Sequence, residues 1–320
     1  MEIKYTVQGL LIYATIAAYL LAFVTTLARR PRAGQMLFFA GFILATVSFI
    51  YRWVHVEHVP LQNLFEVFLF LGVACYPISW FSRRFLQVGC QSFDMLIGAI
   101  VLFPAGFVFN AEPMQLPPAL QSWLFGPHVA VYMTSYMVLA KSAFAALIEL
   151  TSRTKRPSVL LGMIGGLVGA AVGGRLGGIT WGFLQEGLTW GLHGALIGIL
   201  QGAILGVLIK ANRGENALEP EQATYRMASV GFPLLTLGLI LGSWWGKLAW
   251  GRSWGWDPKE LWSLASWLIY VGYFHWRYMF GTRRPRWNSV WAVAGMVAII
   301  ITLLWVNLSK IFSGLHSYAS

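Results

Sequence analysis

The chain alternates long apolar runs with short polar segments. A helix needs about 20 mostly apolar residues to cross a bilayer, and ten runs approach or reach that length. We expect spans at roughly 8–28, 36–53, 64–81, 93–109, 129–150, 159–178, 188–209, 229–246, 259–277 and 289–308. The pattern therefore predicts an all-α fold, a polytopic transmembrane helical bundle of about 10 spans.

The spans fall into three parts. Residues 1–157 hold the first five, 158–210 form a glycine-rich pair, and 211–320 hold the last three. In the middle part, glycines recur at four-residue spacing, which is typical of membrane helices that approach closely. These glycines are Gly162, Gly165, Gly166, Gly169, Gly173, Gly177, Gly194, Gly198, Gly202 and Gly206. We expect a tight hairpin with an outer turn near Gly178–Thr189. Helix packing is the favoured role, with a pore or a partner-docking surface as the alternative.

Composition agrees with this pattern, because 57% of the residues are hydrophobic and only 11% are charged. The net charge of +11 raises the possibility of nucleic-acid binding. However, the basic residues stand in short clusters between apolar runs, as the positive-inside rule predicts for cytoplasmic loops. The clusters are Arg29, Arg30, Arg32; Arg83, Arg84; Arg153, Lys155, Arg156; and Arg277, Arg283, Arg284, Arg286. The expected partner is membrane lipid, with no nucleic acid, and both termini are expected on the outer face.

Two further features exclude classes of protein. The first segment lacks a basic head and a small-residue cleavage site, so we expect a retained helix rather than a signal peptide. Cys75 and Cys90 are the only cysteines, and there is no CxxC. A disulfide framework and a cysteine-rich metal site are therefore not indicated. CxxCH is absent as well, so the chain is not itself a c-type cytochrome.

Tryptophan is concentrated in one place. The stretch 244–267 holds seven of the chain's 16 Trp and contains the sequence WGRSWGWDPKELW. Tryptophans often form a belt at the membrane interface. Here Trp250, Trp254 and Trp256 precede a span and are separated by glycines. This density favours a platform for a large, flat, apolar ligand.

The same stretch predicts the start of a helix. Asp257 can cap the helix, Pro258 suits its first position, and Glu260 completes a capping box. Asp257 is therefore expected to be architectural. His275 follows 18 residues later, about 27 Å along a helix, and so lies toward the cytoplasmic side. An ionisable residue within the membrane is a functional candidate. An interfacial His beside Trp276 and Arg277 is the alternative.

Two other histidines belong to the outer face. His128 begins a span after a proline-rich loop, and His316 follows the last span. Neutral imidazole is a common ligand of haem iron. Each histidine alone would more often be structural, but as a pair they could bind the iron from both faces beside the tryptophans. His193, within the glycine-rich part, is expected to be a hydrogen-bonded polar residue rather than a ligand.

WGRSWGWD matches the W-G-x-x-W-x-W-D signature of the WWD proteins of cytochrome c maturation. Four further segments are similar to family blocks: HVPLQNLFEVFLFL, GPHVAVYMTSYMVLA, GFPLLTLGLILGSWWG and GLHSYAS. Nearly the whole chain thus resembles the CcsA (ResC) family of System II cytochrome c biogenesis, in the CcmC/CcmF/CcsA superfamily. The glycine-rich hairpin has no recognised counterpart. Phe65 and Val67 replace the family's Tyr and Ser, which argues against a need for that hydroxyl.

The resemblance implies a haem b site in residues 211–320, the WWD core, completed by the outer His of residues 1–157. His128 and His316 would be the external axial ligands of the iron, beside Trp250, Trp254, Trp256 and Asp257. His275 would hold haem within the membrane, with the opposite ligand supplied by a CcsB (ResB) partner. No ligand role follows for His58 or Glu66.

The implied function is to move haem outward and present it for covalent attachment to the CxxCH motif of apocytochrome c. The chain would be the haem-handling subunit of a cytochrome c synthase that is active only with its partner, and no catalytic residue is assigned. A bacterial cytoplasmic membrane is expected, with the WWD loop on the periplasmic side. Alternatives are a CcmC-like haem loader without ligation and, from a different class, a membrane transporter or channel.

Overall fold

A computed structural model describes residues 3–113, 115, 117–167, 184–213 and 218–305. Regular structure within these ranges is entirely helical. The helices are α1 (Val7–Leu27), α2 (Pro31–Val56), α3 (Leu64–Phe85), α4 (Gln91–Phe107), η1 (Pro118–Gln121), α5 (Phe125–Leu150), Pro157–Leu167, α7 (Leu184–Asn212), α8 (Pro220–Trp250), α9 (Pro258–Phe280), η2 (Gly281–Arg283), α10 (Pro285–Ile300) and η3 (Ile301–Trp305). Seven are long and apolar enough to cross a membrane. The predicted multi-pass helical membrane fold is confirmed.

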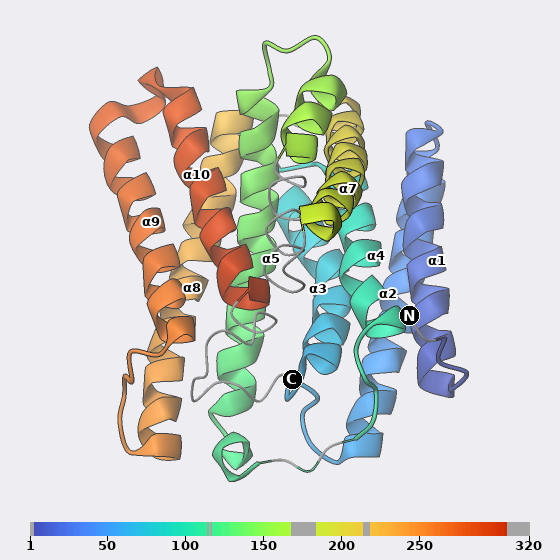
Figure 1. Ribbon diagram of the computed structural model, residues 1–320, viewed down its shortest axis with the longest axis vertical. Coiled ribbons are helices and arrows are strands. Elements are labelled where there is room, and N and C mark those ends of the chain that lie inside the picture. The colour runs from blue at the N-terminus through green and yellow to red at the C-terminus, as the bar shows by residue number, and fades with distance from the viewer. Residues whose placement is uncertain (1–2, 114, 116, 168–183, 214–217, 306–320) are drawn as a thin grey trace. The chain divides into compact units, whose positions relative to one another are not determined.

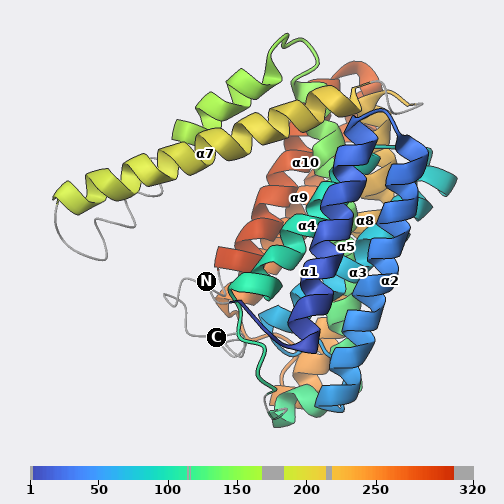
Figure 2. The same ribbon diagram turned by 90° about the vertical axis from the view of Figure 1, so that its right-hand side faces the viewer.

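The chain forms two compact units. Unit 1 comprises Met1–Glu149 and Asn216–Ser320, and unit 2 comprises Leu150–Glu215. In unit 1, successive long helices run in opposite directions (Figure 1). Figure 2 shows α1 beside α2, and α1 also packs on α4. α3 packs on α2 and α4, and α9 packs on α10 and α8.

The alternating directions separate the loops of unit 1 into two ends. The connection between α8 and α9, the start of α3 and η1 lie at one end (Figure 1). The connections from α1 to α2 and from α9 to α10, with the basic clusters at 29–32 and 283–286, lie at the other. The tryptophan-rich loop and these two basic clusters are therefore at opposite ends.

An aromatic core holds the first four helices together. Tyr19 is fully buried, and its hydroxyl donates a 2.9 Å hydrogen bond to the carbonyl oxygen of Gly72 on α3. A Cβ on Gly41 would lie 2.5 Å from the Tyr19 ring, and a Cβ on Gly98 would lie 2.7 Å from it. These glycines let α2 and α4 close around the ring, which meets Phe38 edge to face.

Two ion pairs are buried in unit 1. Lys141 on α5 lies 2.5 Å from the carboxylate of Asp94 on α4, which also accepts a 2.6 Å hydrogen bond from Ser79 on α3. Lys141 donates a further 2.8 Å bond to Ser82. The second pair joins Arg52 of α2 to Glu66 of α3 at 2.8 Å. Each buried charge thus has a partner, which its burial requires.

Unit 2 contains the helix Pro157–Leu167 and α7. A Cβ on Gly165 would collide with the backbone of Gly198, and a Cβ on Gly202 would collide with Leu161. The predicted close approach of glycine-rich helices is confirmed at Gly165, Gly166, Gly198, Gly202 and Gly206. Gly169, Gly173, Gly177 and the first half of the predicted outer turn, 178–183, lie outside the described residues. The prediction of a turn was wrong for its second half, because α7 already begins at Leu184.

Candidate functional site

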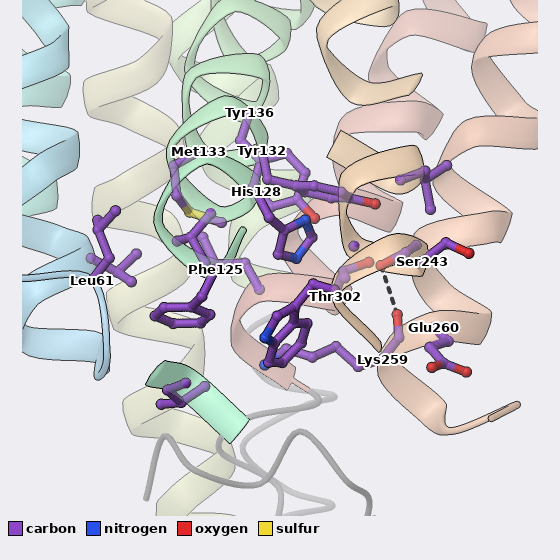
Figure 3. Close-up of a pocket in the computed structure, with 18 of the residues that line it drawn as sticks. Leu61, Phe125, His128, Tyr132, Met133, Tyr136, Ser243, Lys259, Glu260 and Thr302 are labelled. Carbon is purple, nitrogen blue, oxygen red and sulfur yellow. Dashed lines mark hydrogen bonds between the residues drawn. The ribbon is translucent and has the colours of Figure 1, made fainter. Parts of the chain in front are cut away.

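A cavity opens in unit 1 between α5, α8 and the start of α9. The cavity itself has a volume of about 160 Å³, and it opens outward into solvent. Its walls are mostly apolar, with Leu61 and Phe125 on one side and Ser243, Lys259 and Glu260 on the other (Figure 3). His128, Trp245, Trp254, Ser263 and Thr302 complete the polar and aromatic lining.

His128 stands in the wall of this cavity, one turn into α5. Its Nδ1 lies 2.9 Å from the carbonyl oxygen of Gly238 on α8. A carbonyl only accepts hydrogen bonds, so Nδ1 carries the proton, and in a neutral ring the lone pair is then on Nε2. A hydrogen bond of this kind orients metal-binding histidines. His128 therefore has the tautomer that a ligand of iron through Nε2 needs.

Two glycines of α8 make room for the α5 side chains. A Cβ on Gly242 would lie 2.5 Å from Cε1 of His128, and a Cβ on Gly238 would collide with Tyr132. The imidazole consequently rests against the α8 backbone. Sequence reasoning missed Gly238 and Gly242, because their importance depends on the register between two distant helices.

The aromatic ring packed on His128 is Trp245. The two rings stack with centroids 5.8 Å apart and planes 17° apart. Trp245 is 2% exposed, and its Nε1 donates a 2.9 Å hydrogen bond to the carbonyl of Ala119. Sequence reasoning did not assign this residue, although it lies within the tryptophan-rich stretch. The hydrogen bond fixes the Trp245 ring, which packs against the imidazole of His128.

The three predicted platform tryptophans have different positions. Trp250 ends α8 and packs against Trp245, with centroids 4.7 Å apart. Trp254 lines the cavity, and its buried Nε1 has no hydrogen-bond partner among the described residues. Trp256 is 66% exposed and stands at 82° to Trp254. Of the three, only Trp254 lines the cavity beside His128, and it does not form one flat surface with Trp256.

Asp257 begins α9 as predicted. Its Oδ1 accepts a 2.9 Å hydrogen bond from the Glu260 amide, and Glu260 Oε2 accepts one of 3.3 Å from the Asp257 amide. Glu260 Oε2 also accepts a 2.7 Å bond from the amide of Gly255. The capping box is confirmed, and it fixes the tryptophan-rich loop to the helix.

The segment before α3 forms the far wall. Leu61, Gln62, Asn63 and Leu64 line the cavity, and Asn63 caps α3 through a 3.0 Å hydrogen bond from the Glu66 amide. The Glu66 carboxylate itself is engaged by Arg52 and by the amide of Gln62. This arrangement gives Glu66 a structural role in shaping the wall.

The predicted histidines do not all lie at the cavity. His275 is exposed on α9, near the end of unit 1 opposite to the cavity, where Tyr278 and Met279 are also exposed. His316 lies outside the described residues. Of the predicted ligands, the structure places only His128 at the cavity.

Known proteins resemble this chain over most of its length. Residues 61–313 match the family model "Cytochrome C assembly protein". The "Cytochrome c biogenesis protein CcsA" of Prochlorococcus marinus (strain MIT 9303) is 33% identical over 283 residues, 86% of this chain and 80% of the relative. The protein of the same name from Synechococcus sp. (strain CC9605) is 33% identical over 303 residues, covering 90% and 88%.

Proposed function

The chain belongs to the cytochrome c assembly protein family, and from this premise we propose that it binds haem b as its substrate and presents it for attachment to apocytochrome c. The observation that carries the proposal is His128. Its Nδ1 is held by the carbonyl of Gly238, so a neutral ring would have its iron-binding lone pair on Nε2, in the wall of an apolar, aromatic-lined cavity. Ligand sites of this kind combine apolar walls with a few placed polar groups.

His128 would bind the iron on one face of the haem, and His316 would supply the second axial ligand. Trp254 would contact the porphyrin, while Trp245 and Trp250 hold His128 and the loop in place. Asp257 acts through the capping box that anchors this loop. Imidazole ligation also influences the redox potential of the iron.

Attachment would follow when a CxxCH segment docks on the bound haem. The peptide histidine replaces one axial ligand, and each thiol adds across a vinyl group. The sulfur forms a bond to one vinyl carbon and the proton goes to the other, so the addition needs no external oxidant. The protein contributes mainly by orienting the two reactants.

His275 would hold haem earlier in its passage. Its exposed position on α9 leaves room for a ligand from a second membrane protein of the CcsB (ResB) type. We place the tryptophan-rich loop on the periplasmic side of a bacterial cytoplasmic membrane, since the arginine clusters at the opposite end favour the cytoplasm. The glycine-rich hairpin would serve mainly in helix packing.

Purified protein tests the proposed function directly. Full-length chain, coexpressed with a CcsB-type partner, is expected to copurify with haem that has a bis-histidine optical spectrum. The complex should then form thioether-linked haem on a CxxCH peptide under reducing conditions. Haem binding without thioether formation would favour a haem loader, and a complex without haem would contradict both readings.

Gly242→Ala is expected to reduce copurified haem by about tenfold, because the new methyl pushes His128 off its hydrogen bond with Gly238. The haem content per protein, measured from the optical spectrum, checks this. Gly126→Ala is the matched control, since its methyl would meet Val59 at an ordinary 3.8 Å. Equal haem content in both variants would contradict the positioning role of Gly242.

A further inference from the structure

Lys259 brings a positive charge to the cavity. It is the second residue of α9 and lines the same space as His128. Figure 3 shows its side chain extending below His128 toward Phe125. An ammonium group at an apolar wall is costly unless an acceptor meets it.

The acidic side chains beside Lys259 already have other partners. Asp257 and Glu260 accept backbone hydrogen bonds in the capping box. The ion pairs of the described residues use Arg52, Lys141 and Arg277 as their cations, and none involves Lys259. Asp257 attracts the ammonium of Lys259 electrostatically, but no carboxylate of the described residues forms an ion pair with it.

The nearby hydroxyl groups are also engaged. Ser243 donates a 3.0 Å hydrogen bond to the carbonyl of Ser253, and Ser263 donates one of 2.7 Å to that of Lys259. Trp254 adds a second donor, because its buried Nε1–H lacks an acceptor among the described residues. Lys259 and Trp254 thus bring to the same cavity two donors without acceptors among the described residues, and this lining is complementary to an anion.

We propose that Lys259 and the indole N–H of Trp254 bind a propionate carboxylate of the haem, and so set the orientation of the porphyrin in the cavity. This inference rests on the proposed function. Haem carries its propionates on one edge and its vinyl groups away from them. Holding a propionate at the start of α9 therefore directs the vinyl groups away from Lys259. The carboxylate contact selects one orientation of an otherwise nearly symmetric ring.

A pair of pigments tests the carboxylate contact without relying on attachment activity. The complex, stripped of haem, is titrated with iron protoporphyrin IX and with its dimethyl ester, and binding is followed by the Soret band. We expect the unmodified complex to prefer the diacid by about tenfold to hundredfold, the range of a charge-assisted hydrogen bond. Lys259→Met should lose this preference while still binding the ester, and Lys259→Arg should retain it.

Lys247→Met is the matched control. Lys247 is exposed near the end of α8, and its ammonium donates a 3.0 Å bond to the carbonyl of Gly251. The Lys247→Met complex should keep the preference for the diacid pigment. Equal affinity of the unmodified complex for both pigments would overturn the carboxylate contact but leave haem binding intact. A Lys259→Met complex that binds neither pigment would also overturn it. Failure of the unmodified complex to bind either pigment would instead contradict the proposed function.

Discussion

His128→Gly is expected to lower the haem retained by the purified complex at least about tenfold, and added imidazole should restore it. The glycine removes the iron ligand and leaves a space beside Trp245, where the rings now stack 5.8 Å apart. Free imidazole can enter this space and bind the iron, since neutral imidazole is itself a haem ligand. The bis-histidine spectrum, recorded with and without imidazole, measures both effects.

His55→Gly provides the comparison for this experiment. His55 is exposed on α2, and its Nδ1 lies 3.2 Å from the carbonyl of Tyr51 within the same helix. Its replacement should change neither the haem content nor the spectrum. A His128→Gly complex with unchanged haem and spectrum would exclude His128 as a ligand. Loss of haem that imidazole fails to restore would assign the residue to folding of the site instead.

Lys141→Met is expected to destabilise the protein by about 3–5 kcal/mol, because it leaves Asp94 buried without its cation. Lys141 is 1% exposed and Asp94 is 4% exposed, so water compensates neither. Adding Asp94→Asn to Lys141→Met should recover much of the loss, since the uncompensated charge disappears. Thermal unfolding in detergent, compared across the single and double variants, measures this.

Lys155→Met serves as the surface reference, because Lys155 is exposed in the connection before the helix Pro157–Leu167. Its replacement should change stability by less than about 0.5 kcal/mol. If Lys141→Met melted at the same temperature as Lys155→Met, the buried pair would contribute nothing to stability. If the double variant were no better than the single one, the loss would come from the missing lysine stem rather than from the charge.

The features predicted from sequence are those that depend on neighbouring residues. Apolar runs predicted the helices, and Asp257 with Glu260 predicted a capping box, because both patterns extend over one helix or one turn. His128 was predicted as a site residue because it stands at the start of a span. Its link to Gly238 was not visible, because the two residues are 110 positions apart and meet only when α5 packs on α8.

The partners of charged groups were likewise not predictable where they are distant in the sequence. The basic clusters predict an orientation of the helices in the membrane, but Asp94 and Lys141 lie 47 residues apart and their pairing was not anticipated. Lys259 was read only as part of the helix start. Its contribution to the cavity depends on which face of α9 is covered by α5 and α8. That face is set by packing in three dimensions rather than by the local sequence.

Helix α9 carries Lys259 and His275 on opposite sides. The two residues are separated by 16 positions, which at about 100° per residue leaves them about 160° apart around the helix axis. Lys259 lines the cavity, whereas His275 faces away from the protein interior. A haem that visits both positions cannot slide along a single groove. If haem binds at both residues as proposed, it would have to travel around α9, so its route would be a partial turn about this helix as well as a passage along it.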